Sequence, residues 1–144
     1  MLIGVPPLLG PEFLATLRAM GHGDEIAVVD GNYPAAEHAR RLVRADGHGV
    51  LAVVEAVLTV MPLDRSVPAA LFRASLNNDP AQAGEIHRQL DALCARMAPG
   101  MGVMPLSGEA LYQRIRAAHA VVATGEMTLY ANVILRKGVI GAAA

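Results

Sequence analysis

A histidine held between two glycines is the residue of this chain whose type and setting best suit acid–base chemistry. His22 stands in Gly21-His22-Gly23, just before the apolar run 26–29, and Asp30 follows that run. Flanking glycines give the backbone the freedom to present an imidazole in a tight turn. Because histidine gives and takes protons near neutral pH, the pattern predicts acid–base chemistry on a small polar substrate. The open alternative is that Gly21 and His22 only close a helix, with the glycine left-handed and the ring facing the helix dipole.

A second group of polar side chains lies in the segment 124–132, which begins Thr124-Gly125-Glu126 and ends Tyr130-Ala131-Asn132. Its hydroxyl, carboxylate and amide groups supply the donors and acceptors that a polyhydroxylated ligand needs. Tyr130 adds an apolar face for the C–H side of a sugar ring. An ordinary polar turn, whose side chains cap their own backbone, accounts for the same residues. The sequence leaves both interpretations open.

The composition limits the classes of protein and partner. The 144 residues fit a single domain spanning 1–144, and 53% apolar against 17% charged residues favours self-association into a homo-oligomer. A net charge of −1 and 3% aromatic residues provide neither a basic stripe nor stacking groups, so nucleic acid is not expected as a partner. The most apolar stretch, Val50–Val60, is shorter than the ~20 residues of a membrane span. Without a secretory signal at the N-terminus, a cytoplasmic location is expected.

No metal or nucleotide cofactor is expected. The five histidines are not paired at ligand spacing; His87 is expected on the solvated face of a helix and His119 at a helix end. The single cysteine, Cys94, is expected to be a buried apolar residue. The pattern Gly47-x-Gly49-x-x-Ala52 opens a helix, but the strand before it carries arginines and is too polar for the central strand of a dinucleotide site.

Strands and helices alternate along the chain, which predicts an α/β domain with a largely parallel sheet flanked by helices. Hydrophobic periodicity and turn residues predict helices at Pro11–Met20, Val50–Val60, Gln82–Met97 and Ser107–His119, and strands at Ile26–Val29, Arg40–Arg44, Val67–Phe72, Val103–Leu106, Ala120–Thr124 and Asn132–Leu135. Ligands of such sheets lie at the carboxyl ends of the strands, where Asp30 and the turn 124–126 are expected.

Several blocks of the sequence together resemble one known family. They are Gly21-His22-Gly23-Asp24-Glu25 with Asp30 and Pro34, Val43-Arg44-Ala45-Asp46-Gly47, Pro62-Leu63-Asp64, Val121-Val122-Ala123-Thr124-Gly125-Glu126, and the segment Tyr130–Val139. In this order they resemble the L-fucose mutarotase and D-ribose pyranase family, more closely its fucose branch. The resemblance implies a cofactor-free enzyme that interconverts sugar anomers and assembles into a closed ring, such as a decamer, with substrate pockets near subunit contacts.

The resemblance also implies roles for individual residues. His22 would be the catalytic acid/base, Asp30 would hold sugar hydroxyls or fix the tautomer of His22, and Tyr130 and Asn132 would line the pocket, with Tyr130 able to complete a proton relay. Gly108 stands where the family usually has an arginine or a histidine that binds substrate; Glu109 and Arg114 are candidates to replace it.

The function predicted in this way is a monosaccharide mutarotase that acts by ring opening and closure. The alternative is a monosaccharide-binding or transport-associated protein without catalysis.

Overall fold

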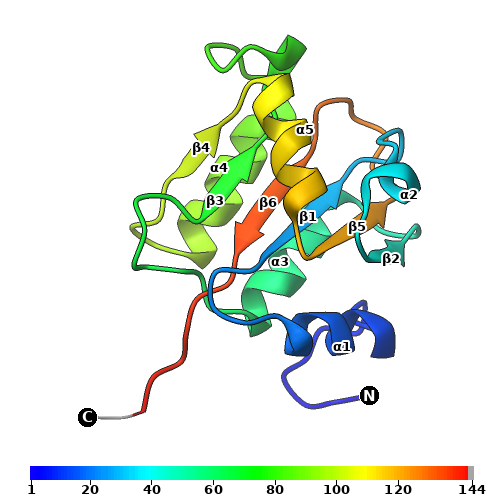
Figure 1. Ribbon diagram of the computed structural model, residues 1–144, viewed down its shortest axis with the longest axis vertical. Coiled ribbons are helices and arrows are strands. Elements are labelled where there is room, and N and C mark those ends of the chain that lie inside the picture. Colours follow the sequence, from blue (N-terminus) through cyan, green and yellow to red (C-terminus); the bar gives the residue numbers. More distant parts are fainter. Residues whose placement is uncertain (143–144) are drawn as a thin grey trace.

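The computed structural model describes residues 1–142, which fold around one six-stranded sheet in the order β2-β5-β1-β6-β3-β4 (Figure 1). The strands are β1 (Glu25–Val29), β2 (Leu42–Ala45), β3 (Leu71–Arg73), β4 (Val103–Pro105), β5 (Ala120–Thr124) and β6 (Val133–Arg136). The helices are α1 (Pro11–Ala19), α2 (Ala35–His38), α3 (Val50–Val60), α4 (Glu85–Met97) and α5 (Gly108–Ala117), with a short 3-10 turn η1 (Leu76–Asn78).

Only β6 runs against the other strands. It is antiparallel to both neighbours, β1 and β3, while β1 and β2 pair with β5, and β3 with β4, in parallel. The prediction of a largely parallel sheet is therefore confirmed. β1 and β5 are continuous apolar runs because both faces of the sheet are covered, whereas the exposed Arg44 lies on β2 at the sheet edge.

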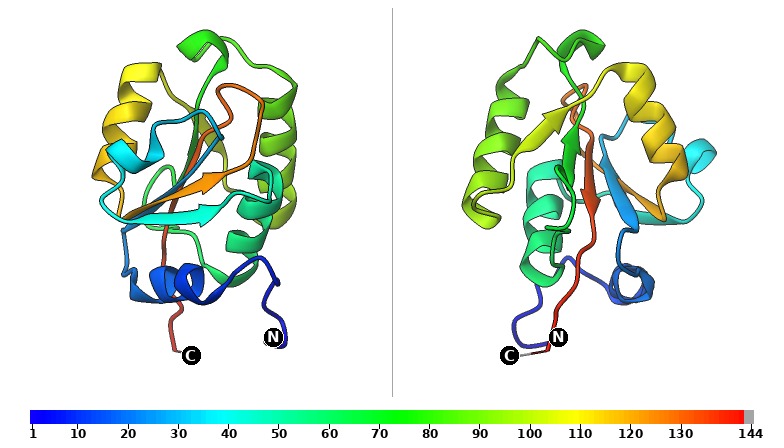
Figure 2. Two further views of the ribbon diagram at one scale, coloured as in Figure 1. Left: turned by 90° about the vertical axis from the view of Figure 1, so that its right-hand side faces the viewer. Right: turned by 60° about the vertical axis from the view of Figure 1, so that its left-hand side comes forward.

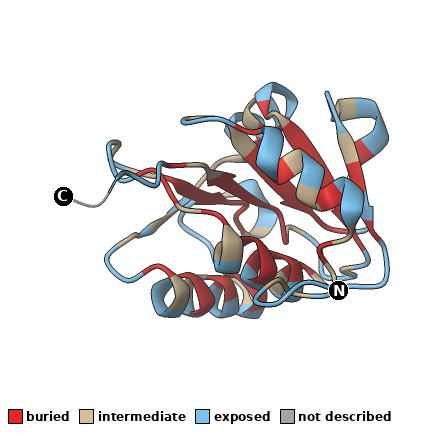
Figure 3. Ribbon diagram, turned by 90° about the horizontal axis from the view of Figure 1, so that it is seen from below, coloured by how far each residue is buried: buried red, intermediate tan, exposed pale blue. Residues whose placement is uncertain are grey.

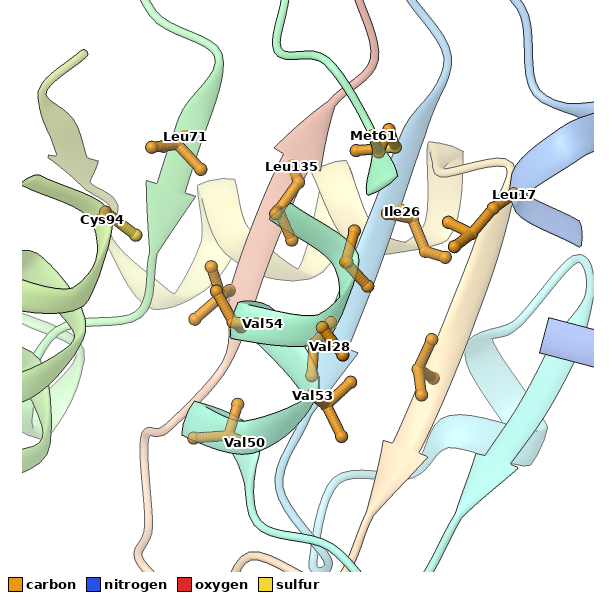
Figure 4. Close-up of a cluster of buried hydrophobic side chains, with 14 of the residues drawn as sticks. Leu17, Ile26, Val28, Val50, Val53, Val54, Met61, Leu71, Cys94 and Leu135 are labelled. Atoms are coloured by element: carbon orange, nitrogen blue, oxygen red, sulfur yellow. The ribbon is translucent and has the colours of Figure 1, made fainter. Parts of the chain in front are cut away.

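Helices cover both faces of the sheet, as the nearly edge-on view in Figure 2 shows. Alternate residues of β1 separate the two cores: Ile26 and Val28 face α1, α3 and α4, whereas Ala27 and Val29 face α2 and α5. Figure 3 shows the buried strands between these helical layers, and Figure 4 shows side chains of α3 packed on β1 and β6. Both faces of the sheet are therefore covered, and the loops lie at the two ends of its strands.

The sequence predicted most elements with small errors at their ends. Val50–Val60 and Ala120–Thr124 are confirmed as a helix and a strand with the predicted bounds. The helix α2 was missed because four residues are too few for a periodic pattern, and the strand predicted at Val67–Phe72 is confined to Leu71–Arg73. None of the helices within residues 1–142 is long and apolar enough to cross a membrane.

Two predictions for α4 have opposite outcomes. Cys94 is buried as predicted, and burial raises the pKa of its thiol to about 11. The prediction of a solvated His87 is wrong, since only 1% of this residue is exposed. Polar neighbours in the sequence suggested a solvated face, but the ring turns inward and bonds to two backbone groups.

The end of α1 shows whether Gly21 and His22 close this helix. The helix ends before Met20, whose backbone is extended, and the left-handed glycine is Gly23 (φ 86°), not Gly21. Lys137 Nζ donates to the carbonyls of Leu17 and Met20, each at 2.7 Å, and so satisfies the end of the helix. The alternative in which Gly21 and His22 close the helix is therefore wrong.

Candidate active site

The carboxyl end of the sheet brings Asp30 and Asn132 together from distant parts of the chain. Asp30 follows β1, and because β6 is antiparallel, Asn132 precedes its neighbour at the same edge. The Asn132 side-chain oxygen accepts a hydrogen bond from the Asp30 backbone N–H at 2.9 Å. Tyr130, partly buried, lies two residues before Asn132 with a left-handed backbone (φ 60°). Three of the predicted site residues therefore meet at one edge.

The Asp30 carboxylate lies at a cavity. It is 5% exposed and accepts a bond from the Asn32 N–H at 2.9 Å. Burial raises the pKa of Asp30 above its ordinary value, the N–H groups of Asn32, Ala131 and Tyr33 partly offset this, and the negative charge of Glu126 adds to it. The cavity has a volume of about 400 Å³ and is also lined by Tyr33, Arg44 and Thr124. A polar ligand there would meet both carboxylate and guanidinium groups.

The turn after β5 is built largely by its own side chains. Thr124 Oγ1 donates to the Val29 carbonyl at 2.7 Å and accepts from the Glu126 N–H. Glu126 accepts from the N–H groups of Val50, at the start of α3, and of Thr128. Burial raises the pKa of Glu126, but hydrogen bonds from the backbone and side chain of Thr128 and from the N–H groups of Val50 and Met127 lower it more, so that it lies below the ordinary value. For Thr124 and Glu126 the structure thus favours the polar-turn interpretation.

Gly108 begins α5 at this same edge and has no room for a side chain. A Cβ added there would lie 2.6 Å from Cγ of Asn78, whose side chain fills the space. Arg114 does not replace the missing group, because it is paired with Glu25 at 2.8 and 2.7 Å, at the start of β1. Glu109 is exposed in the first turn of α5. Asn78 is therefore the polar side chain next to Gly108.

His22 lies just before the start of β1, at the opposite end of the strands from Asp30. The side chain is 50% exposed, with Nε2 3.2 Å from Asp64 Oδ1 and 3.5 Å from Ser66 Oγ. A Cβ on Gly23 would approach the Arg136 guanidinium to 3.0 Å, which together with its positive φ explains the glycine. His22 and Asp64 line a second cavity of about 400 Å³. The imidazole is presented to solvent, as the sequence predicted.

Asp64 is the carboxylate that orients His22, and the sequence did not single it out. Its side chain is 2% exposed and accepts bonds from Ser66 N–H (2.9 Å), Ser66 Oγ–H (2.6 Å) and Arg136 Nε–H (2.9 Å). These donors hold the pKa of Asp64 well below its usual range. The ionised carboxylate can keep a proton on His22 Nε2, which leaves Nδ1 of the neutral ring as the acceptor. Its place in the block Pro62-Leu63-Asp64 was the only signal.

The two groups of residues are far apart within one chain. The stretch from Asp24 to Asp30 spans roughly 20 Å at the rise of a β-strand. The prediction that Asp30 fixes the tautomer of His22 is therefore wrong within a chain, where Asp64 takes that position. In Figure 1 the loop before β6 and α2 lie beyond the arrowheads of β1 and β5, while α1 lies at the other end. Each chain thus carries two separate groups of candidate residues, to which we give the name half-sites.

A family model, described as the RbsD / FucU transport protein family, matches residues 3–140. The chain belongs to this family. It is 39% identical to the fucose mutarotase of Homo sapiens over 143 residues, covering 95% of this chain and 93% of that protein. It is also 39% identical to the fucose mutarotase of Bos taurus over 150 residues, covering 97% and 95%.

The fold of this chain also matches that of a solved structure. The fucose mutarotase from Streptococcus pneumoniae, in complex with L-fucose, superposes with a TM-score of 0.89 at 36% identity. The superposition covers 97% of this chain and all of that chain. Both the sequence and the fold therefore match over nearly the full length, and the resemblance stated from the sequence blocks is confirmed.

Proposed function

We propose that this protein is a cofactor-independent mutarotase that interconverts the anomers of L-fucose or a related aldose. The observation that carries this function is the match to fucose mutarotases at 39% identity over 95% of the chain. The fold shared with a mutarotase that was solved with L-fucose supports a monosaccharide as the substrate.

The reaction needs only proton transfers and one bond that breaks and reforms. The anomeric hydroxyl loses a proton while the ring oxygen gains one, the bond between C1 and the ring oxygen breaks, and an open aldehyde forms. Rotation about the C1–C2 bond and the reverse steps give the other anomer. Because this reaction already proceeds in water, the ~10²–10⁴-fold that positioned acid–base groups supply is sufficient.

The half-sites suggest how the residues divide the work. His22 exchanges a proton with the sugar at one edge, oriented by Asp64 through the 3.2 Å contact to Nε2. At the other edge Asp30 accepts from sugar hydroxyls, Asn132 holds the Asp30 backbone, and Tyr130 covers the apolar side of the ring. The cavity at Asp30 is not itself lined by Tyr130 or Asn132, so these two side chains would meet the sugar beside it. The Tyr130 hydroxyl or a water completes the proton relay.

A complete site then needs two copies of the chain. One copy supplies the His22 edge and the next supplies the edge with Asp30 and Tyr130, which is a head-to-tail interface and closes into a ring. Apolar side chains flank both edges and support such contacts. Met127 and Leu129 are 87% and 58% exposed beside Tyr130, and Val139 and Ile140 are 64% and 84% exposed after β6 on the His22 side.

Asn78 and Gly108 bear on which sugar is preferred. Since Asn78 fills the space above Gly108, a neutral amide borders this part of the edge instead of a long cationic side chain. An amide can both donate to and accept from sugar hydroxyls, whereas an arginine can only donate. The cytoplasmic location stays a prediction from the sequence.

The experiment is exchange NMR between the α and β anomers of L-fucose, with D-ribose as a second sugar. The wild type should accelerate exchange, and His22→Ala should reduce it by about 10²-fold or more while L-fucose still binds. Exchange that is unchanged in His22→Ala would remove this histidine from the chemistry. Thermal stabilisation by sugar without faster exchange would instead support a binding or transport-associated protein, which the family description also names.

A further inference from the structure

His87 is a buried histidine that the mechanism above does not use. It lies in the first turn of α4 and links this helix to the segment before β6, far away in the sequence. Its Nδ1 is 2.9 Å from the Gly84 backbone nitrogen, and its Nε2 is 2.8 Å from the Tyr130 carbonyl oxygen. Both ring nitrogens are thus engaged with backbone groups.

These two contacts fix the protonation of the ring. A backbone N–H only donates, so Nδ1 must be the unprotonated acceptor; a carbonyl only accepts, so Nε2 must carry the hydrogen. Burial lowers the pKa of His87, and the nearby Arg73 and Arg88 lower it further, against the opposing effects of the Tyr130 carbonyl and Asp91. The neutral Nε2–H form therefore persists at neutral pH.

The bond to His87 falls at a backbone conformation that is unusual for a tyrosine. Tyr130 has a φ of 60°, which non-glycine residues rarely adopt unless the surroundings hold them there. The residues just before it, Met127 and Leu129, are exposed and offer little packing, whereas Ala131 and Asn132 after it are buried. The His87 bond to the Tyr130 carbonyl lies at the junction between these two parts, next to the bond from the Ala131 N–H to Asp30.

We infer that His87 is a positioning residue, which acts through its Nε2–H bond to hold Tyr130 in the conformation needed for the sugar site. The role of His87 in the sugar site rests on the proposed function. Its role in holding the backbone of Tyr130 does not depend on that function. His87 does not touch the reacting atoms. By holding the Tyr130 backbone, it fixes the position from which the side chains of Tyr130 and the neighbouring Asn132 extend. The competing explanation is that His87 only caps α4 through Gly84.

Two amide variants separate these roles. In His87→Asn the side-chain oxygen overlies the former Nδ1 and keeps an acceptor for the Gly84 N–H, but nothing reaches Tyr130. In His87→Gln the side-chain nitrogen overlies the former Nε2 and keeps a donor for the Tyr130 carbonyl, while the helix cap is lost. Both variants place an amide at the same buried position, so each is the matched control for the other.

Activity and structure are then measured on both variants. Positioning predicts that His87→Gln stays within about threefold of the wild-type kcat/KM for L-fucose anomer exchange, while His87→Asn loses about tenfold or more. Amide NMR signals of Tyr130 and Ala131 should shift in His87→Asn and stay near wild type in His87→Gln. Equal losses in both variants, in step with their melting temperatures, would overturn the inference, as would wild-type activity in His87→Asn.

The NMR readout keeps the inference testable if the function is wrong. A long-range proton–nitrogen spectrum of the wild type should show His87 as the Nε2–H tautomer. If the wild type failed to accelerate exchange for any sugar, the proposed function would fall, while the Tyr130 and Ala131 signals would still show whether His87 holds the segment. An Nδ1–H tautomer, or unchanged signals in His87→Asn, would refute the positioning role.

Discussion

The two half-sites of each chain lead to a quantitative prediction about mixed oligomers. His22 precedes β1 and Asp30 follows it, so roughly 20 Å separate the edges on which they lie. Two variants each disable one edge: His22→Ala removes the imidazole, and Asp30→Asn removes a charge while keeping an oxygen that accepts from the Asn32 N–H. Asp30→Asn loses a charged hydrogen-bond partner and should keep roughly one tenth to one hundredth of the activity. His22→Ala loses the acid–base group and should keep about one hundredth or less.

The expected activity of mixtures follows from counting sites. If each site takes its two edges from different chains, an equal mixture of the single variants contains about one quarter intact sites. The double variant mixed equally with wild type also gives about one quarter, since both edges must then come from wild-type chains. If each site lay within one chain, the first mixture would have no intact site and the second about one half.

The assay uses chains mixed in urea and refolded together, with anomer exchange of L-fucose measured by NMR per total chain. Wild type taken through the same steps controls for recovery, and each variant refolded alone gives the background. Equal rates from the two mixtures, near one quarter of wild type, are the expected result. A first mixture at background and a second near one half would refute the shared site and with it the division of work between the edges.

Three further predictions concern Asp64, His87 and the buried core. Asp64→Asn should lower kcat for anomer exchange about tenfold or more, because His22 loses its ionised partner; a KM change alone would contradict this. The pKa of His87 in the folded chain lies below 6.5, so the unfolded chain binds this proton at a higher pH than the folded chain does. The free energy of unfolding in urea should therefore fall as the pH drops below 6.5. His87→Gln should make this decline less steep, and parallel curves for the variant and the wild type would contradict the prediction. Ile134→Ala, at a fully buried position, should lower the free energy of unfolding by about 2–5 kcal/mol, whereas Ile3→Ala, at an exposed position, should change it by about 0.5 kcal/mol or less.

The sequence predicted the core elements well because their signals are local. The apolar runs of β1 and β5 are short, whereas the largely apolar α3 is 11 residues long, and this difference in length separates strands from a helix. The arginines near β2 correctly excluded a central strand, and the structure places β2 at the edge. The helix α2 was not predicted, because a single turn is too short to give a periodic pattern and its packing on β5 is a long-range contact.

The site could be predicted only in part, because its contacts are long-range. Presentation of His22 follows from its glycines, and the meeting of Asp30 with Asn132 requires the antiparallel direction of β6, which no local pattern gives. The Asp64 contact to His22 joins segments that only the finished sheet brings together. The inward turn of His87 is of the same kind, since the Tyr130 carbonyl that holds it is fixed by the fold.

The antiparallel strand β6 explains how one small domain can carry both half-sites in fixed relation. Asn132, just before β6, bonds to Asp30. Arg136, at the end of β6, bonds to Asp64, and Lys137, the next residue, bonds to the end of α1. β6 is hydrogen-bonded to β1 and β3 in the middle of the sheet, so one strand connects both groups of residues. In the proposed head-to-tail assembly, an open row of copies would leave one unused half-site at each end. A closed ring would complete every site, and burial of the exposed apolar side chains beside both groups would favour closing it.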